Sequence, residues 1–481
     1  MQLRQVVLLV IICLSSHTYG AADAEPELPA GLGSEVGSDE PLLPPGLSIS
    51  GREQGEPSLP AGLGETEAAP QSKGSEGLER RSIDLSGFAE ARVGSRIGND
   101  KNEKQKSILE SRLQIQWEQQ WLALTSRLTL DLLYDDVVDN RSVALESGRG
   151  WLDLREAYLL FRPFAKMDIK AGRQILTWGT GDLMFINDLF PKDWNAFFIG
   201  RDDEYLKAPS DALKVGVFGS RFNIEMIYTP RFDADRYIDG SRISFFNPNQ
   251  GAVVGQHDNF HVDRPDQWFS EDEWSARLYT NRGSLELAIY AYQGYWKSPN
   301  GTDAKTGRFI FPRLEVGGVS LRGPVYRGIA NLELGYYHSK DDSSGKSPFV
   351  RNSEWRMLLG YEQELMKNFS GSMQFYLEHK EDYRAYLESL PGGAAEADED
   401  RFVWTLRLTR LLLNQNLVLS LFNFYSPTDK DGYARLKAQY KISDAWQVEW
   451  GANLFYGENQ HTFFGQFEDN SNLYLSARYG F

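Results

Sequence analysis

The sequence is poor in cysteine and histidine, and it has no long hydrophobic run after its N-terminus. Cys13 is the single cysteine, so an internal disulfide and a cysteine-based metal site are both excluded. No later stretch of about eighteen apolar residues occurs, which excludes membrane-spanning helices. Acidic residues outnumber basic ones, 67 to 51, and such a chain lacks the basic footprint that phosphate groups require. A nucleic-acid partner is therefore excluded.

Catalytic signatures are missing as well. The sequence contains no G-x-S-x-G elbow, no H-E-x-x-H motif and no P-loop. His257 and His261 share the segment 230–271 with Asp258 and Asp263, and these four side chains could ligate a divalent ion. A cluster of this kind is more often a solvated loop. We therefore predict no enzymatic activity, no cofactor and no metal.

Aromatic residues are abundant for so polar a composition, at 13%. Two classes of protein combine these properties, a carbohydrate-binding β protein and a membrane barrel with aromatic girdles. Residues 1–22 carry Arg4, an apolar core at 6–14 and small residues at 19–22, which is typical of a secretory signal peptide. Cys13 lies in that apolar core and would be removed with it. The chain is therefore predicted to be exported.

Residues 23–81 are acidic, rich in glycine and proline, and free of aromatic residues. Such a segment buries too little apolar surface to offset its ordering entropy, so we expect it to be disordered. It repeats the pattern L-P-x-G-L at 28–32, 43–47 and 59–63. The repeats are interpreted as parts of a low-complexity periplasmic linker, and the alternative is that each is a docking motif for a periplasmic partner.

From residue 82 to 481 the sequence consists of short segments in which apolar and polar residues alternate. A period of two residues is typical of a strand with one apolar face. In 401–410, for example, Phe402, Trp404 and Leu406 share one face. Eighteen strands are predicted: 83–97, 107–118, 121–134, 151–162, 167–176, 211–218, 221–229, 272–281, 284–294, 312–321, 326–337, 353–363, 369–380, 401–410, 416–425, 432–441, 446–456 and 471–481.

The connections between these strands alternate between short turns, such as 119–120 and 282–283, and long loops, such as 177–210 and 230–271. A soluble sandwich has no reason to sort its loops in this way, whereas bacterial barrels combine short periplasmic turns with long external loops. The apolar face of the last strand ends on Phe481, which resembles the signal that the barrel assembly machinery reads. We therefore predict an all-β fold, a transmembrane antiparallel barrel of about eighteen (16–18) strands in outer-membrane lipid.

One segment carries a more specific resemblance. The strand 167–176 ends with Gly172, Arg173 and Gln174, and Trp178-Gly179, Asp182 and Asn187-Asp188…Pro191-x-Asp193 follow. Over about forty residues this motif resembles the uncharacterised large-porin and alginate-export-like group of outer-membrane porins. In that group the loop after this strand tends to lie inside the pore. The resemblance therefore implies a constriction near Asp182, Asp188, Asp193, Arg201, Asp202, Asp203 and Glu204, and the alternative is an ordinary solvated external loop.

Two charged residues interrupt apolar faces of neighbouring strands. In the strand 167–176, Arg173 follows Ile169 and Ala171 on the apolar face. In the neighbouring strand 151–162, Glu156 stands between Leu154 and Tyr158 on the apolar face. A charge that faces lipid at mid-depth costs about 2–4 kcal/mol. Arg173 is therefore expected near the outer interface or turned inward by a bulge at Gly172, and Glu156 and Arg173 are predicted to pair across the hairpin.

The inferred lumen face carries both signs of charge, as expected for a water-filled interior. Six cations near the barrel closure could form a basic ladder that guides anions: Arg92, Arg96, Arg407, Arg435, Lys437 and Arg478. The leading functional prediction is an outer-membrane channel for a small hydrophilic solute, narrowed by loop 177–210. Two alternatives stay open, an export conduit for polysaccharide or lipid that works with a periplasmic or inner-membrane partner, and a closed structural or adhesive barrel.

Overall fold

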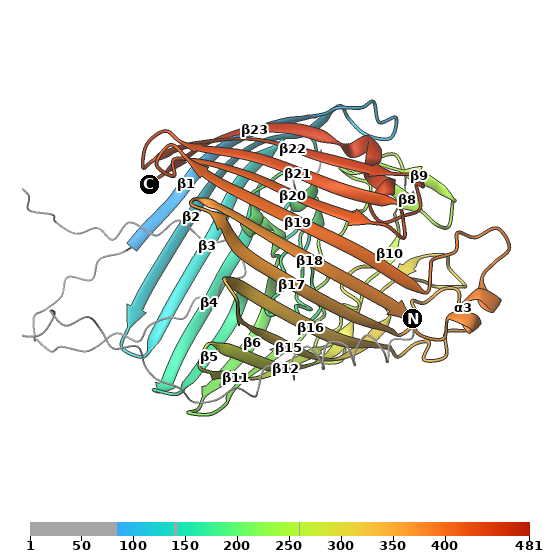
Figure 1. Cartoon of the computed structure of the whole chain (residues 1–481), viewed down its shortest axis with the longest axis horizontal. Coiled ribbons are helices and arrows are strands. Elements are labelled where there is room, and N and C mark those ends of the chain that lie inside the picture. The colour runs from blue at the N-terminus through green and yellow to red at the C-terminus, as the bar shows by residue number, and fades with distance from the viewer. Residues whose placement is uncertain (1–83, 139–141, 259) are drawn as a thin grey trace, which may run out of the picture. The chain divides into compact units, whose positions relative to one another are not determined.

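A closed antiparallel β-barrel accounts for most of the chain in the computed structural model, which describes residues 84–138, 142–258 and 260–481 (Figure 1). Eighteen strands form the barrel. They are β1 (Asp84–Arg96), β2 (Lys106–Trp121), β3 (Leu124–Asp135), β4 (Leu152–Phe164), β5 (Met167–Ile175), β6 (Pro209–Phe218), β7 (Asn223–Thr229), β11 (Glu273–Arg282), β12 (Leu285–Tyr295), β15 (Arg313–Val325), β16 (Gly328–Ser339), β17 (Glu354–Met366), β18 (Phe369–Lys380), β19 (Asp400–Leu412), β20 (Leu417–Ser426), β21 (Asp431–Lys441), β22 (Trp446–Gly457) and β23 (Asn472–Gly480).

Each barrel strand pairs with the next one along the chain, and β23 closes the barrel against β1. The last residue takes part in this closure, because Phe481 and Gly87 exchange two backbone hydrogen bonds of 3.0 Å. The predicted signal peptide, the acidic segment 23–81 and its L-P-x-G-L repeats lie outside the described residues.

All eighteen predicted strands are confirmed, and the largest boundary error concerns β15. Its end is predicted at residue 321 and found at Val325. Pro324 pairs with Ile329 beside the turn, where a proline is tolerated near a strand end. The alternation of loop lengths has one exception. The connection 427–430 on the long-loop end is no longer than the turn 413–416 on the other end.

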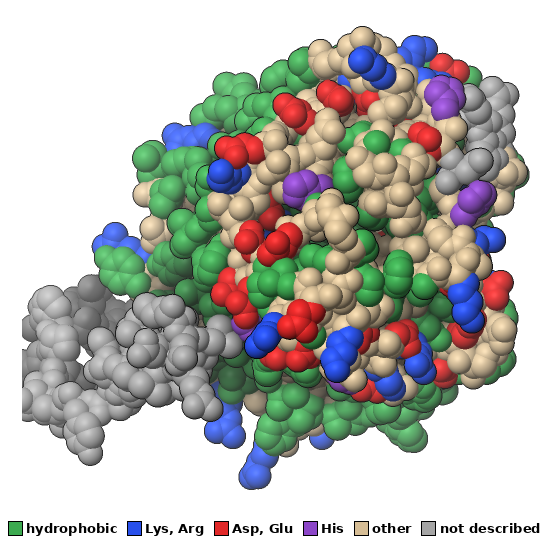
Figure 2. Space-filling model, turned by 90° about the vertical axis from the view of Figure 1, so that its right-hand side faces the viewer, with side chains coloured by type: hydrophobic (Ala, Val, Ile, Leu, Met, Phe, Trp, Pro, Cys, Tyr) green, Lys and Arg blue, Asp and Glu red, His purple; other side chains and the backbone are tan. Residues whose placement is uncertain are grey.

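Outward-facing and inward-facing side chains differ as the alternation predicts. Leu159, Ile289 and Trp450 point outward and are about half exposed. Arg112 and Asp131 point inward and are buried. Figure 2 looks onto the end with the long loops, where charged side chains are spread over the surface and hydrophobic side chains gather at its margin. None of the helices in the described parts of the chain has the length and apolar character needed to cross a bilayer.

Short elements of the long loops lie at this same end of the barrel (Figure 1). β8 (Phe245–Asn247) pairs with β9 (Ala252–Val254), and β14 (Phe309–Ile310) pairs with both β10 (Val262–Asp263) and β13 (Gly301–Thr302). The helical elements in the described ranges are α2 (Trp194–Phe198), η1 (Asp203–Leu206), α3 (Tyr383–Ser389) and η2 (Gly465–Asn470).

The loop 97–105 packs against the loop that carries β9, and one buried acid makes this contact sensitive to pH. The Asn102 side chain donates to the Val253 carbonyl at 3.3 Å, and the Gln256 amide donates to the Asn102 carbonyl at 3.2 Å. Burial raises the pKa of the neighbouring Glu103 to about 7. A raised carboxyl pKa means that the folded loop binds the proton more tightly than the open loop. The stabilisation is therefore complete below about pH 4.5 and is lost as the pH rises through about 7.

Replacing Glu103 with glutamine is expected to abolish this pH dependence, because the amide keeps the shape of the protonated carboxyl but does not ionise. Hydrogen exchange at the Gln256 amide, corrected for intrinsic rates, should show protection that falls from pH 5.5 to pH 8 in the parent and stays level in Glu103→Gln. Glu146→Gln is the matched control, because Glu146 lies in another loop, where it pairs with Arg231. A parent whose protection does not change with pH would contradict the expectation.

Candidate functional site

The loop between β5 and β6, residues 176–208, lies in the interior of the barrel. It contains α2 and η1, and Ile186, Phe197 and Ile199 on it are almost fully buried. Its side chains and backbone contact strands on every side of the barrel: β1, β2, β3, β4, β7, β12, β15, β16, β18, β19, β21, β22 and β23. A segment with contacts in all these directions must cross the lumen.

The first part of this loop is held by one carboxylate of the wall. Glu333 on β16 is 1% exposed. Its Oε1 accepts hydrogen bonds from the Gly181 amide and the Thr180 hydroxyl, both at 2.9 Å, and also from the Thr180 amide. Its other oxygen accepts from the Asn187 backbone amide at 3.2 Å and from the Asn187 side chain at 2.9 Å. Glu333 therefore clamps two points of the loop to β16.

The middle of the loop is the short helix α2, which is capped by an acid and anchored by a ring. The Asp193 carboxylate accepts from the Ala196 amide at 2.7 Å, the usual arrangement of a helix N-cap. Phe198 at the other end lies with its ring centroid 5.5 Å from Tyr433, 5.1 Å from Phe455 and 5.1 Å from Phe467. These rings form one apolar cluster between α2 and the wall of β21 and β22.

The charged residues of the loop are paired with charged residues of the wall. Ion pairs join Asp182 to Arg407 at 2.5 Å, Arg201 to Glu110 at 2.5 Å, Asp202 to Arg478 at 3.2 Å and Asp203 to Arg435 at 2.6 Å. Burial alone would raise the pKa of Asp203, but the adjacent Arg435 and Lys437 hold it below its ordinary value. Asp203 therefore stays ionised inside the barrel at neutral pH.

The seven residues predicted at a constriction take three different roles. Asp182, Arg201, Asp202 and Asp203 join the loop to the wall through these ion pairs. Asp188 pairs with Lys192 within the loop at 2.9 Å, and Asp193 caps α2. Glu204 lies at η1, where its backbone carbonyl accepts from Arg155 at 3.1 Å.

The six cations of the predicted basic ladder face the interior, but they do not form an unopposed ladder. Arg407, Arg435 and Arg478 pair with acids of the loop. Arg92 pairs with Glu90 and Glu449, both at 3.1 Å, and Lys437 lies 3.6 Å from Glu449. Arg96 donates to the Asn470 side chain at 3.3 Å. In this conformation the loop and wall carboxylates offset most of the charge that the ladder would present to an anion.

The predicted pair between Glu156 and Arg173 is not formed. The register of β3 and β4 shifts so that Thr129 faces Glu156 and Leu130 faces Leu154, which leaves Arg155 as an extra, bulged residue. The bulge turns Glu156 inward, where it pairs with Arg127 at 2.9 Å. Arg173 pairs instead with Asp211 of β6 at 3.0 Å and donates to the Leu145 carbonyl of the loop between β3 and β4 at 2.7 Å. Arg173 therefore lies near the end of the barrel that carries the long loops.

A double-mutant cycle distinguishes the two pairings. Arg173→Ala and Asp211→Ala should show a coupling free energy of about 1 kcal/mol, small because Asp211 is partly exposed to solvent. Arg173→Ala and Glu156→Ala should be additive. Urea unfolding of the protein in lipid vesicles measures both cycles, and a coupling confined to Arg173 and Glu156 would overturn the assignment.

Four residues that hold the loop 176–208 in place were not predicted as site residues. Glu333 follows the same alternation as the other inward-facing residues of its strand, and Arg236, Phe198 and Tyr205 carry no signal in the sequence, because their partners lie on strands distant in sequence. Arg236 illustrates this, since it is 3% exposed and its guanidinium lies between Asp153, at 2.7 Å, and Asp193, at 3.3 Å. In the described ranges no group of three or more His, Cys, Asp and Glu residues is placed to hold a metal ion.

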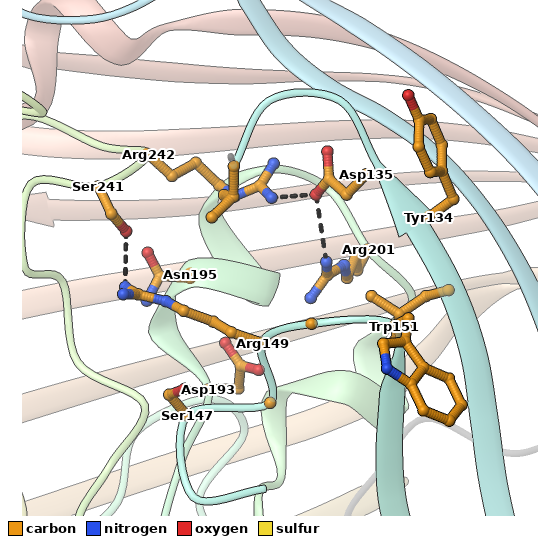
Figure 3. A pocket seen from close by; sticks show the side chains of 14 residues that line it. Tyr134, Asp135, Ser147, Arg149, Trp151, Asp193, Asn195, Arg201, Ser241 and Arg242 are labelled. Carbon is orange, nitrogen blue, oxygen red and sulfur yellow. Dashed lines mark hydrogen bonds and ion pairs between the residues drawn. The ribbon is translucent and has the colours of Figure 1, made fainter. Parts of the chain in front are cut away.

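A cavity of about 160 Å³ opens beside α2 at the long-loop ends of β3 and β4 (Figure 3). Three arginines from three different loops line it, and each already has an acidic partner. Arg149 pairs with Asp239 at 2.6 Å, Arg242 pairs with Asp135, and Arg201 lies between Glu110 and Asp135. The cavity is therefore polar but locally balanced in charge.

Comparisons with known proteins show the fold. No family model matches the chain, and no curated protein matches it. Among solved structures, the chain is similar to OccAB4 of Acinetobacter baumannii, with 10% identity, 84% of this chain and 99% of that chain covered, and a TM-score of 0.51. It is also similar to OccAB3 of the same organism, with 11% identity, 83% and 99% coverage, and a TM-score of 0.50. At such low identity these similarities concern the barrel architecture alone.

Proposed function

We propose that the protein is an outer-membrane channel for small hydrophilic solutes and that the inner loop, residues 176–208, narrows its lumen. The observation that carries this proposal is a barrel with an apolar outside and a charged inside, crossed by that loop. An outward belt of Leu, Val, Ile and Trp side chains is stable in lipid and unfavourable in water. Eighteen strands enclose a lumen wide enough for water once part of it is free of loops.

Several finer assignments belong to the same proposal. The short turns face the periplasm and the long loops face the outside, so that segment 23–81 is periplasmic and free to contact a partner there. Phe481, at the closing strand, serves as the recognition signal for the barrel assembly machinery. The motif after β5 supports membership in the large-porin and alginate-export-like group of porins.

The test is single-channel conductance in a planar bilayer. Replacing residues 182–204 with a glycine–serine segment of equal length removes Asp182, α2 and the ion pairs while keeping the chain connected. We expect the conductance to rise several-fold, because the narrowest part of the lumen would lose its packed side chains. The control replaces 383–398, the external loop with α3, by the same kind of segment and should leave the conductance unchanged. A conductance that is the same in all three proteins would contradict the proposed constriction.

One observation favours a second candidate, a closed structural barrel. The loop 230–272 also enters the outer half of the lumen, where Phe232, Ile243 and Ser244 are almost fully buried. If the parent and the loop-replaced protein both carry no current, the closed barrel is the better interpretation. An export conduit would show current only with its periplasmic partner present, and removing residues 23–80 would then abolish the effect of that partner.

A further inference from the structure

The inner loop is attached by different chemistry to two parts of the barrel wall, β21–β22 and β2–β4, which β23 and β1 separate. On the wall of β21 and β22 a cluster of rings around Phe198, Tyr433 and Phe455 packs beside the ion pair between Asp203 and Arg435. Separating these rings would expose apolar surface to water, and the free-energy cost grows with the area exposed. This wall is therefore the side on which the loop is hardest to detach.

The wall of β2, β3 and β4 holds the same loop through polar groups. The Tyr205 hydroxyl donates to Asp131 at 2.8 Å and accepts from Gln114 at 3.0 Å. Arg155 donates to the Glu204 and Lys207 carbonyls at 3.1 and 2.8 Å. Buried charges and hydrogen-bonding groups regain hydration when water enters, so their separation costs much less than the number of bonds implies.

The contacts of the inner loop with Gln114, Asp131 and Arg155 form a polar seam that runs along the wall of β2, β3 and β4. At its outer end is the cavity of Figure 3, lined by Asp135, Asp193 and Arg201 beside α2. At its inner end Arg127 pairs with Glu156, and the Arg127 side chain is 35% exposed, so water already reaches it. The seam thus joins an open cavity on the outside to a hydrated part of the lumen.

The loop 230–272 moves with the inner loop, because the two are interlocked. The Arg236 amide donates to the Lys192 carbonyl at 2.8 Å, and the Asp235 carboxylate accepts from the Lys192 amide at 2.8 Å and from the Trp194 indole at 3.1 Å. Two acids of the wall hold this unit, Asp153 of β4 through Arg236 and Asp135 of β3 through Arg242, and Arg242 also donates to the Ser107 carbonyl of β2 at 3.0 Å. Parting the seam therefore requires these contacts to open while the loop-to-loop contacts remain.

We propose that solutes pass between the wall of β2–β4 and the unit formed by the inner loop and the loop 230–272. The aromatic cluster on β21 and β22 is the fixed anchor about which this two-loop unit moves away from that wall. This inference rests on the proposed channel function and assigns its route. The route is lined by Glu110, Arg112, Asp131, Asp153 and Arg155, a charged surface of both signs. It fits a small, strongly hydrated solute and disfavours an apolar one.

The test locks one side of the unit at a time in the folded full chain. Cys13 is the single native cysteine, so Cys13→Ala gives a background without thiols. Gln114→Cys with Tyr205→Cys places two thiols across the polar seam, and Phe198→Cys with Tyr433→Cys places two thiols across the aromatic anchor. A short bismaleimide, added after refolding, links each pair, and a monofunctional maleimide of similar size is the control for added bulk.

Relative to the Cys13→Ala protein, we expect the link across the seam to reduce single-channel conductance at least tenfold. The link across the anchor replaces the lost ring contact and should leave the conductance within twofold of that protein. Loss of current only with the anchor link, loss with both links, or no loss with either would overturn the route. The unlinked cysteine variants separate this outcome from failure of the channel function itself, because a barrel that is not a channel carries no current before any reagent is added.

Discussion

Replacing Glu333 with alanine is expected to release the first part of the inner loop and, if the proposed channel function holds, to raise the conductance of the barrel. The variant leaves the amides of Thr180, Gly181 and Asn187 without their acceptor inside the barrel. A buried donor without a partner costs about 1–3 kcal/mol, and three such donors in one segment are not strictly additive. We therefore expect a local destabilisation of about 3 kcal/mol, which corresponds to about a hundredfold faster opening.

Hydrogen exchange at these three amides measures the opening directly, and bilayer recordings measure its effect on current. Glu286→Ala is the matched control, because Glu286 is also an inward-facing acid of the wall but pairs with Arg277 at 2.6 Å. Unchanged protection at Gly181 in Glu333→Ala would show that the carboxylate does not hold the loop.

Replacing Phe198 with alanine is expected to have the second large effect, on the anchor of α2. The Phe198 ring is 2% exposed and is surrounded by the rings of Tyr433, Phe455 and Phe467. Removing a buried phenyl ring of this kind costs about 3–5 kcal/mol, because the hydrophobic contact is lost and a cavity remains. The barrel strands do not depend on this ring for their pairing, so the loss should appear as mobility of the inner loop and not as unfolding of the barrel.

Limited proteolysis of the protein in vesicles should therefore cut the segment 182–204 at least tenfold faster in Phe198→Ala, with little change in the thermal unfolding of the strands. Phe463→Ala is the control, because Phe463 lies in the neighbouring loop and is 44% exposed. Rapid cutting in both variants, or in neither, would contradict the anchoring role.

The barrel itself was predictable because its rule is local. Along each strand the side chains alternate between the outside and the lumen of the barrel, so a few residues of segments such as β19 and β22 are enough to assign each side chain to one face. The exceptions are positions where the backbone breaks the alternation. The bulge at Arg155 shifts the register of β4. No local sequence pattern indicates this bulge, so Glu156 was assigned to the outward face although it points inward.

The sequence by itself determined the number and direction of the strands, the apolar outside and the charged inside, because each of these follows from neighbours along the chain. The tertiary structure alone decided which charges meet. Asp203 and Arg435, or Glu333 and Gly181, lie far apart in sequence and come together only when the barrel closes around the loop. Inside a closed barrel nearly every charge must find a partner from another strand or loop, and the choice of partner depends on packing in three dimensions, which alternation does not encode.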